Sequence, residues 1–516
     1  MPDSRRRFLA NLLAAPLVSL PSPKIFRAWN LFDDQDLQTR LAADPLRPQC
    51  HLLPAKNWMN DPNGPILWKG LYHMFFQYNP NAAVWGDMHW AHAVSPDMIH
   101  WRHLPIALAP TAGWADADGC FTGSAVDDGG TATVIYTGVK SVSATPELAT
   151  LRDGKQTLRE VQCLATSRDP QLRTWTKWRN PILEPPSDPL LTGFRDPFLW
   201  SDGGFWYLGV GSGIRKQGGR VLLYRSKDLR EWKYLHPLVS GKWTEKENTN
   251  PVDSGEMWEC PDFFRLGKKH VLLYSTAGKV IWETGELDPK EVVFHSERSG
   301  LLDYGAYYAQ KTQLDAHGNR MLWGWSPETR PEAEFSAAGW AGCMALPRIL
   351  SLNTKNDLEM RLALLAQSLR EKLIASLRAG SSAQERMRAI RPARIEKLAG
   401  ELTWKTDSGP FTVTLADAIG PWWSLRVTQT SSGTTLLVND KPVELPVQPG
   451  DELKFHLLLD ASVAEFFCND LYVVTSRIYR EPSGPLHLQI ADSDLHLFRE
   501  LEIWQLGAIS ADRLTT

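Results

Sequence analysis

The chain has 516 residues, of which 43% are hydrophobic and 22% are charged, a composition typical of a globular protein with two or three domains. Its formal net charge of -3 gives no reason to expect nucleic acid or an anionic membrane as a partner. The six cysteines lie far apart, and no pair has the spacing of metal ligands, so disulfides are permitted but not required.

Residues 1–23 are predicted to be a targeting segment. Arginines at positions 5–7 precede Phe8, Leu9 and an apolar run that ends at Leu20, which is too short to span a bilayer. Arginines followed by Phe-Leu match a twin-arginine export signal. We therefore expect export to the periplasm or out of the cell, with a polar lead-in segment over residues 24–47. A disordered basic tail is the alternative, and retention of the signal as an anchor stays open.

Residues 48–354 are predicted to form short strands joined by tight turns. Runs rich in β-branched and aromatic residues, such as 71–78, 205–210 and 271–275, are separated by Gly, Asp and Asn. A Ser-x-Asp pattern with a following Trp recurs in this region, at Ser95 to Trp101, Ser226 to Trp232 and, more loosely, Ser167 to Trp175. This repeat predicts a Ser/Asp-capped turn between outer strands, with the Trp packed between units.

Five acidic residues each precede a strand, a glycine turn and a second strand: Asp61, Asp118, Asp196, Glu259 and Asp303. They are roughly 45–75 residues apart, close to the period of propeller blades. Since the innermost strands of a propeller face its central channel, acids at the starts of these strands would converge on one axial pocket. The sequence therefore predicts a five-bladed β-propeller over residues 48–354. A sandwich with scattered surface acids is the alternative.

The pattern changes after the propeller region. Leucines at 362, 365, 369, 373 and 377 repeat at helical spacing before Gly380, so residues 355–398 are predicted to be a linker, with or without a helix, packed against a domain. Residues 399–510 contain eight short runs that alternate apolar with polar residues, which predicts a β-sandwich. Its expected role is structural, or accessory sugar binding. The fold class is therefore all-β, a five-bladed β-propeller followed by a C-terminal β-sandwich.

Three of the acids suit the cleavage of a glycosidic bond, which needs one carboxylate at the anomeric carbon and one acid at the leaving oxygen. Asp61 lies between Asn60 and Asn63, whose amides are expected to hold its pKa down, as suits a nucleophile. Glu259 follows Trp258, and this apolar setting is expected to raise its pKa, as suits a general acid.

Asp196 is the third acid. It stands beside Arg195, so it is expected to be ionised and to accept hydrogen bonds from sugar hydroxyls. Cys260 is expected to be a small packed neighbour of Glu259 rather than a nucleophile.

Five of the thirteen histidines fall between His73 and His103, but no metal site is predicted. His89 and His92 would point to opposite faces of a strand, because side chains alternate. The sequence has no serine in a nucleophile elbow and no phosphate-binding loop, so no cofactor is expected.

Several motifs stand out along the chain: WMNDPNG at 58–64, FFQYNP at 75–80, WGDMHW at 85–90, FTGS at 121–124, RDP at 195–197, WECPD at 258–262, LDYG at 302–305, WGW at 323–325, GWAG at 339–342 and DASVAEFF at 460–467. In combination they resemble glycoside hydrolase family 32, which holds invertases, levanases, inulinases and exo-fructan hydrolases. The resemblance covers about residues 48–506.

The resemblance implies a five-bladed propeller with a sandwich domain and a retaining hydrolysis of β-fructofuranosides. It implies that Asp61 is the nucleophile, Glu259 the acid/base and Asp196 the transition-state stabiliser. The residues implied to line the fructose subsite are Asn60, Gln77, Trp85, Phe121, Thr122 and Arg195.

The chain departs from the family pattern at two places. Thr122 stands where the family usually has serine, although the hydroxyl group is kept. The segment 277–282 does not match the Asp/Lys pattern that plant invertases use for sucrose, which leaves the leaving group undecided.

The expected enzyme is therefore a β-fructofuranosidase or exo-fructanase acting on sucrose or fructo-oligosaccharides, without a cofactor. In a retaining enzyme the carboxyls of Asp61 and Glu259 lie roughly 5–5.5 Å apart. The alternatives are a transfructosylase or a levan or inulin hydrolase with the same site, a non-catalytic sugar-binding propeller, and a related five-bladed family that acts on arabinans, usually by inversion. The oligomeric state is left open.

Overall fold

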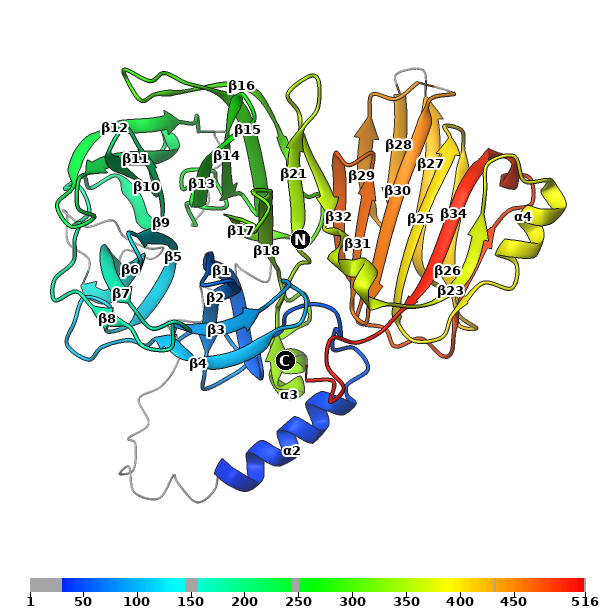
Figure 1. Ribbon diagram of the computed structural model, residues 1–516, viewed down its shortest axis with the longest axis horizontal. Helices are drawn as coiled ribbons and strands as arrows, with labels where there is room; N and C mark the ends of the chain where they lie inside the picture. Colours follow the sequence, from blue (N-terminus) through cyan, green and yellow to red (C-terminus); the bar gives the residue numbers. More distant parts are fainter. Residues whose placement is uncertain (1–29, 144–155, 244–249, 431–432, 449, 515–516) are drawn as a thin grey trace.

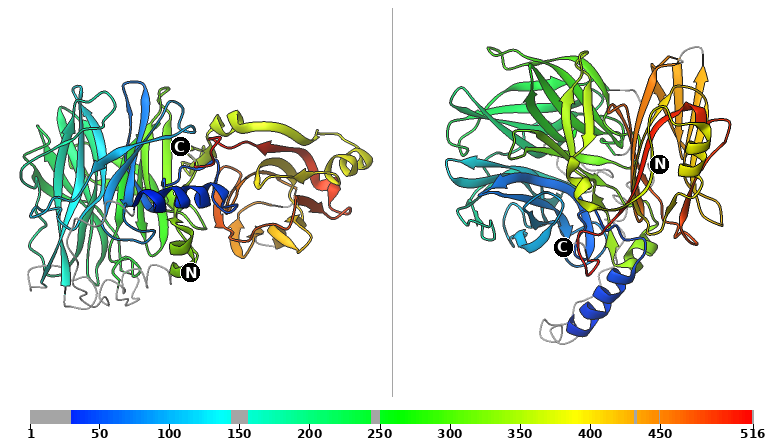
Figure 2. Two further views of the ribbon diagram at one scale, coloured as in Figure 1. Left: turned by 90° about the horizontal axis from the view of Figure 1, so that it is seen from below. Right: turned by 45° about the vertical axis from the view of Figure 1, so that its right-hand side comes forward.

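The computed structural model describes residues 30–143, 156–243, 250–430, 433–448 and 450–514, and it shows two β-domains side by side (Figures 1 and 2). The predicted export signal and the first residues of the lead-in segment lie outside the described residues. The rest of the lead-in contains helix α2 (Asn30–Ala43), which extends away from the two domains (Figure 1). No helix in the described ranges is long and apolar enough to cross a membrane.

The first domain consists of five sheets that follow one another along the chain, each with four main strands in antiparallel order. Their strands are β1 (Asn57–Trp68), β2 (Leu71–Asn79), β3 (His89–Ser95) and β4 (Arg102–Leu108); β5 (Gly119–Asp128), β6 (Thr131–Ser143), β7 (Gln156–Ser167) and β8 (Thr176–Lys177); β9 (Leu191–Asp202), β10 (Phe205–Ile214), β11 (Gly218–Ser226) and β12 (Lys233–Ser240); β13 (Glu259–Leu266), β14 (Lys269–Thr276), β15 (Lys279–Leu287) and β16 (Phe294–Leu301); β17 (Tyr308–Leu314), β18 (Arg320–Ser326), β21 (Arg348–Leu352) and β22 (Leu358–Leu362).

The first strands of these sheets form a closed ring. Strand β1 contacts β5, β5 contacts β9, β9 contacts β13, β13 contacts β17, and β17 contacts β1. Figure 1 shows the outer strands of each sheet fanning away from that centre. The close approach of β1 and β5 requires Gly64, since its φ is 44° and a Cβ there would lie 2.9 Å from the Ala125 nitrogen. The predicted propeller is confirmed.

The ring closes where the end of the fifth sheet meets the first strand. The short strand β19 (Trp340–Ala341) follows helix α3 (Glu332–Ala338) and pairs in parallel with β1, so that Asn57 lies opposite Trp340 and Trp58 opposite Ala341. The Asn57 nitrogen also donates to the Gly339 carbonyl at 2.7 Å. A second short strand, β20 (Cys343–Met344), pairs with β18.

The repeated Ser-x-Asp pattern forms the predicted turn between the two outer strands of a sheet. In the turn from β3 to β4, Asp97 accepts hydrogen bonds from the backbone nitrogens of Ile99 and His100 and from the Ser95 hydroxyl. Asp228 makes the equivalent contacts from β11 to β12. These capped turns are the sequence repeat most directly visible in the structure.

The second domain is a sandwich of two six-stranded sheets. One sheet has the order β23 (Arg370–Leu377), β34 (Phe498–Leu506), β25 (Ala399–Asp407), β30 (Glu452–Asp460), β31 (Val463–Cys468) and β32 (Tyr472–Arg477); the other has β24 (Arg394–Ile395), β33 (Leu486–Ile490), β26 (Phe411–Ala416), β27 (Pro421–Thr430), β28 (Gly433–Val438) and β29 (Lys441–Leu445). Aromatic residues from both sheets, including Trp404, Trp423 and Phe466, pack into one core between them.

The predicted linker at 355–398 is wrong, because most of this segment belongs to the two domains. Strand β22 completes the fifth sheet, β23 and β24 are edge strands of the sandwich, and only α4 (Ala383–Ile390) and the 3-10 turn at Leu364–Leu369 are helical. The helical prediction fails because Ala375 and Leu377 are buried on either side of the exposed Ser376, which is the alternation of a strand, and a bulge between Leu373 and Ala375 leaves Leu373 43% exposed. Pairing with β34 therefore overrides the local helical period.

Buried charged groups join the two domains. Arg348, in the fifth sheet, donates to Asp303 and to Glu465 of the sandwich, each at 2.9 Å. His51 joins Glu465 to Asp460 through its two ring nitrogens, at 3.0 and 2.7 Å. All five side chains are essentially excluded from solvent. The expected position of Asp303 at an axial pocket is therefore wrong, since its carboxylate belongs to the interface between the domains.

Two buried histidines contact each other in the first sheet. His73 Nδ1 lies 2.8 Å from His92 Nε2, and neither residue is exposed. Burial lowers the pKa of His73 to about 4 and that of His92 well below its usual value. Both rings are therefore neutral in the folded protein at neutral pH.

We expect acidification to destabilise the fold through His73. Its pKa is about 6.5 when unfolded and about 4 when folded, so its stabilising effect is complete above pH 6.5 and is lost as the pH falls towards 4. The loss is about 2.5 kcal/mol at pH 4.5. His73→Gln should lose less thermal stability than the wild type between pH 7 and pH 4.5, whereas His317→Gln, at an exposed turn, should match the wild type. Equal losses in all three proteins would contradict this prediction.

Candidate active site

Each of the five inner strands carries a two-residue β-bulge at the same level. The register shifts place two residues of each inner strand opposite one residue of the second strand: Asn60 and Asp61 opposite Gln77, Phe121 and Thr122 opposite Thr137, Asp196 and Pro197 opposite Val210, Cys260 and Pro261 opposite Tyr274, and Ala309 and Gln310 opposite Gly324. A bulge re-aims side chains that a regular strand would alternate between faces. The five inner strands thus each have a bulge, at which their side chains do not follow regular alternation.

Three of these bulges place a residue other than glycine in the left-handed region. Asp196 has a φ of 63°, Cys260 of 48° and Ala309 of 55°, each at the first bulge position of its strand. Such backbone conformations cost energy and persist only where the surroundings enforce them. Their recurrence in three neighbouring strands shows that the bulge geometry is built into the ring.

Asp61 is held by groups from three strands. Its two oxygens accept from Asn60 Nδ2 at 3.0 Å and from the Thr122 hydroxyl at 2.8 Å. The Cys260 thiol donates to the same oxygen as Thr122 at 3.3 Å. Trp58 in turn fixes Asn60, since its indole nitrogen donates to the Asn60 oxygen at 2.7 Å. Asp61 is 7% exposed, so its carboxylate is oriented by neighbours rather than by water.

Asn63 does not supply the second amide expected on Asp61. Its side chain faces Gln77, Trp90 and Thr122. It is two residues beyond Asp61, and the bulge ends between them, so the two side chains leave the strand in different directions.

Asp196 shares Cys260 with Asp61. Its Oδ2 accepts from the Cys260 backbone nitrogen at 2.9 Å and from the Cys260 thiol at 3.5 Å. Burial raises the pKa of Asp196 to about 7; Arg195 lowers it, while Glu259 and Asp61 raise it further. The expectation that Arg195 keeps Asp196 fully ionised is therefore wrong, because burial outweighs the nearby guanidinium. Burial also raises the pKa of Cys260, so Cys260 remains a thiol that bridges two carboxyls.

Glu259 lies in a more polar setting than the sequence predicted. Its Oε1 accepts from Arg195 Nη2 at 2.9 Å, and its Oε2 accepts from the Tyr308 hydroxyl at 2.8 Å. Trp258 is turned away and stacks on Tyr274 with 3.8 Å between ring centroids. Adjacent side chains of a strand point to opposite faces, which explains why the apolar neighbour does not cover the carboxyl.

Arg195 is shared between two carboxylates. Besides its contact with Glu259, it donates from Nη1 to Glu160 Oε1 at 3.0 Å. The other oxygen of Glu160 accepts from the Phe194 backbone nitrogen at 2.5 Å. Burial alone would lower the pKa of Arg195, but Glu160, Glu259 and Asp196 hold it well above its usual value. Arg195 is therefore a fixed cation beside Glu259.

The remaining predicted subsite residues lie at the same end of the ring. Gln77 is opposite the bulge of Asp61 and donates to the Cys120 carbonyl at 2.9 Å. Trp85 and Phe121 are partly exposed and meet edge to face, with 5.9 Å between centroids. The structure thus gathers all nine predicted residues. The acid expected at the second strand start does not join them, since Asp118 is exposed and accepts from the Ser141 nitrogen.

Two residues of the site were missed by sequence reasoning. Tyr308 begins the fifth inner strand and precedes its bulge, just as Glu259 precedes the bulge of the fourth, so strand alignment is the signal that would have found it. Glu160 lies in an outer strand, β7, and no local motif marks it.

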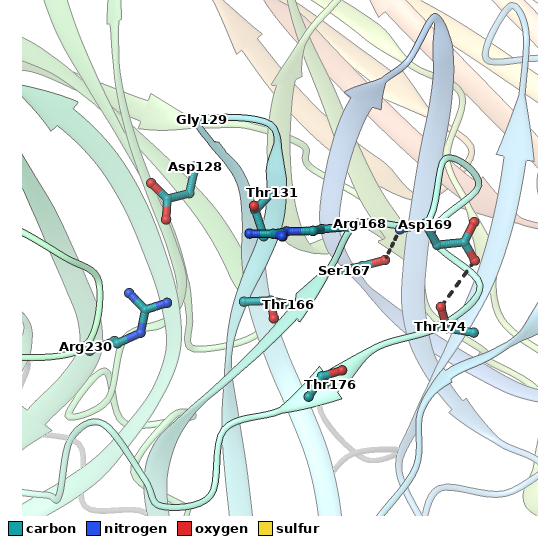
Figure 3. A pocket seen from close by; sticks show the side chains of 10 residues that line it. All are labelled: Asp128, Gly129, Thr131, Thr166, Ser167, Arg168, Asp169, Thr174, Thr176 and Arg230. Carbon is teal, nitrogen blue, oxygen red and sulfur yellow. Dashed lines mark hydrogen bonds between the residues drawn. The ribbon is translucent and has the colours of Figure 1, made fainter.

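A separate pocket lies at the far end of the second sheet (Figure 3). It has a volume of about 670 Å³ and is lined by charged residues from three turns, including Asp128, Arg168, Asp169 and Arg230. Strand β5 begins beside the acids and ends at Asp128, so this pocket is outside the candidate active site. In the part of the chain that the structure describes, no group of three or more His, Cys, Asp or Glu residues is arranged to hold a metal ion.

Comparison with known families agrees with this geometry. Residues 51–361 match the glycosyl hydrolases family 32 N-terminal domain, and residues 423–505 match the glycosyl hydrolases family 32 C-terminal domain. The chain belongs to glycosyl hydrolase family 32. The predicted resemblance is therefore confirmed, and with it a glycosidase built from a β-propeller and a β-sandwich.

Individual members of the family are similar over nearly the whole chain. The sucrose-6-phosphate hydrolase of Escherichia coli is 34% identical over 89% of this chain and 95% of its own length. The GH32 beta-fructofuranosidase of Bombyx mori, solved as a variant in complex with sucrose, is 29% identical with a TM-score of 0.72, covering 93% of this chain and 99% of that one. A variant of fructan 1-exohydrolase IIa from Cichorium intybus in complex with 1-kestose is 27% identical with a TM-score of 0.73, covering 90% and 98%.

Proposed function

We propose that this glycosidase releases fructose from the non-reducing end of β-fructofuranosides, sucrose or fructo-oligosaccharides, by a retaining double displacement. The observation that carries the proposal is the meeting of Asp61, Asp196 and Glu259, from three different sheets, in one buried cluster. The similarity to family members named for sucrose and fructan hydrolysis supports it.

In the proposed mechanism Asp61 attacks the anomeric carbon of the terminal fructose while Glu259 protonates the departing oxygen. Hydrogen bonds from Asn60 and Thr122 aim the attacking carboxylate. The products of this step are the free leaving group and a covalent fructosyl-enzyme ester. Glu259, now a carboxylate beside Arg195, then takes a proton from water, which attacks the same carbon and releases fructose with its configuration retained.

Asp196 is proposed to bind hydroxyl groups of the fructose ring. Its protonation state fits this role, because a carboxyl with a pKa of about 7 exchanges its proton near neutral pH and forms hydrogen bonds in either state. The separation of 5–5.5 Å between the carboxyls of Asp61 and Glu259 stays a prediction from the retaining mechanism, at roughly that value.

Substrate preference is tested by comparing products from a panel of sugars. Sucrose, sucrose 6-phosphate, 1-kestose, inulin and levan are incubated with the enzyme, and the products are separated by chromatography. Release of fructose from sucrose and 1-kestose is expected. Sucrose 6-phosphate is the second candidate substrate, because the Escherichia coli relative is named for it. Failure to release fructose from every sugar would overturn the proposal.

Hydrolysis is proposed in preference to transfer, in which a second sugar displaces the fructosyl group instead of water. The two differ only in the acceptor, so both use Asp61 and Glu259. At high sucrose concentration a hydrolase yields equal amounts of glucose and fructose. An excess of glucose together with longer oligosaccharides would identify a transfructosylase.

Glu259→Gln is expected to lower kcat for sucrose by about 10³-fold, because the leaving oxygen then receives no proton. The loss should be much smaller for p-nitrophenyl β-fructofuranoside, whose leaving group departs without protonation. Initial rates of both substrates measure this difference, and Glu286→Gln, an exposed acid of the same sheet, serves as the control. Equal losses on the two substrates would remove Glu259 from the role of acid.

We further propose that the protein is exported by the twin-arginine route. The support is the arginine-rich start followed by Phe8, Leu9 and an apolar run. In a bacterium with this pathway, the wild-type chain is expected in the periplasm or medium, and a chain with lysines in place of Arg5 and Arg6 is expected in the cytoplasm. Cell fractionation with a fructose-release assay distinguishes these results, and cytoplasmic wild-type activity would contradict export.

A further inference from the structure

Lys311 is a buried lysine at the centre of the propeller. It is carried by β17 and is 2% exposed. Its ammonium nitrogen donates to the Pro261 carbonyl at 3.1 Å, the Pro197 carbonyl at 3.3 Å and the Ser124 hydroxyl at 3.4 Å. These three partners belong to β13, β9 and β5. Because only a position on the axis reaches four of the five inner strands, the ammonium group occupies the central channel.

Two of the three contacts of Lys311 are made with bulges of the inner strands. Pro197 follows Asp196, and Pro261 follows Cys260. The Cys260 thiol contacts both Asp61 and Asp196. On two sides the ammonium group is therefore linked to the acid cluster through the backbone of a bulge.

The buried charges near the ammonium group of Lys311 are unequal in number. The cluster contains the carboxyls of Asp61, Asp196 and Glu259, and its nearest cation, Arg195, is already paired with Glu259 and Glu160. Among the described residues Lys311 has no carboxylate at ion-pair distance, and all of its hydrogen bonds go to neutral oxygens. A buried cation without a direct counter-ion is costly unless nearby negative charge compensates it. The acid cluster provides that charge.

We propose that Lys311 is a positioning residue of the reaction: it holds the bulge of Asp196 and the bulge of Cys260, whose thiol contacts Asp61, and its positive charge stabilises negative charge on the two aspartates. Lys311 touches neither substrate nor reacting atoms. The inference rests on the roles proposed above for the two aspartates. The ionisable groups around the channel are Asp61 of β1, Glu160 of β7, Arg195 and Asp196 of β9, Glu259, Cys260 and Asp262 of β13, and Tyr308 of β17.

The first test removes the charge at nearly constant shape. In Lys311→Met the acid limb of the kcat/KM profile for sucrose should move upward by about one pH unit, since loss of a nearby opposite charge disfavours the ionised carboxylates. At pH 5 this appears as about a tenfold loss that shrinks as the pH rises. The control is Lys269→Met, which removes an equal charge at the start of β14, the second strand of the fourth sheet. Its profile should match the wild type.

The second test keeps Lys311 and neutralises it. Ser124→Asp places a carboxylate against the ammonium group, and Ser124→Asn has the same shape without the charge. The acid limb should move upward in the aspartate variant only. This pair decides the question if Lys311→Met does not fold.

The outcomes are distinct. An acid limb unchanged in both Lys311→Met and Ser124→Asp would overturn the proposal. So would a lower urea midpoint with an unchanged pH profile, because Lys311 would then contribute to packing alone. Failure of the proposed function appears separately, as absence of fructose release by the wild-type enzyme.

Discussion

Replacing Asp61 by Asn is expected to reduce fructose release from sucrose by about 10⁴-fold or more, as for the loss of other catalytic nucleophiles. An amide is a poor nucleophile and forms no fructosyl ester. The fold should tolerate the change, because an amide retains an oxygen that accepts from Thr122 or Asn60. The measurement is the rate of fructose release at saturating sucrose, combined with a urea unfolding curve.

The matched control is Asp202→Asn. Asp202 is exposed at the far end of the inner strand β9, so the same chemical change there should leave the rate unchanged. Substantial residual turnover by Asp61→Asn, with a normal unfolding curve, would exclude Asp61 as the nucleophile. A neighbouring acid would then have to carry the covalent step.

The second large effect concerns stability. Arg348→Met is expected to lower the free energy of unfolding by about 3–5 kcal/mol, because it leaves the buried carboxylate of Asp303 without a cation and that of Glu465 with His51 alone. Asp303 and Glu465 each accept from Arg348 at 2.9 Å and have no exposure to solvent. The expected readout is a lower urea midpoint than that of the wild type.

Two comparisons isolate the cause. Arg298→Met breaks the more exposed ion pair with Asp357 and should cost less than about 1 kcal/mol. The triple variant with Arg348→Met, Asp303→Asn and Glu465→Gln removes the buried charges together and should recover much of the loss. If Arg348→Met unfolds at the wild-type midpoint, the buried network does not stabilise the junction of the two domains.

The same network has a defined pH range. Despite burial, His51 has its pKa raised to about 9 by Asp460 and Glu465, so its contribution is complete below pH 6.5 and is lost as the pH rises through 9. Arg348 and His51 lower the pKa of Glu465 to about 2 against the effect of burial. Its contribution is complete above pH 4.5 and is lost as the pH falls through 2. These two groups therefore favour the joined domains most between about pH 4.5 and 6.5.

The sequence was sufficient for the architecture but not for the surroundings of each acid. Motifs such as WMNDPNG and WECPD mark the starts of inner strands, and the propeller followed from their spacing. The settings of Asp196 and Glu259 were predicted from adjacent residues; the prediction for Asp196 was wrong, and the raised pKa of Glu259 stays a prediction. Neighbours in a strand face opposite sides, so the groups that contact a carboxyl come from other strands, as Tyr308 does for Glu259.

The misread linker has a related cause. The leucines at 362–377 have helical spacing, but Leu373 and Leu377 pair with residues of β34 that lie more than 100 residues away. The spacing of residues within a segment cannot show that the segment pairs with a distant strand. The Ser-x-Asp turns were predictable because their hydrogen bonds stay within a few residues, as those of Asp97 do.

The propeller ring is closed by the pairing of β1 with β19, and this seam lies next to the catalytic residue Asp61. Asn57 and Trp58 pair with Trp340 and Ala341, and Asp61 follows only three residues after Trp58. The two ends of the ring therefore cannot separate without carrying Asp61 out of alignment. Inactivation by heat or denaturant should begin at this seam, while all five sheets are still folded.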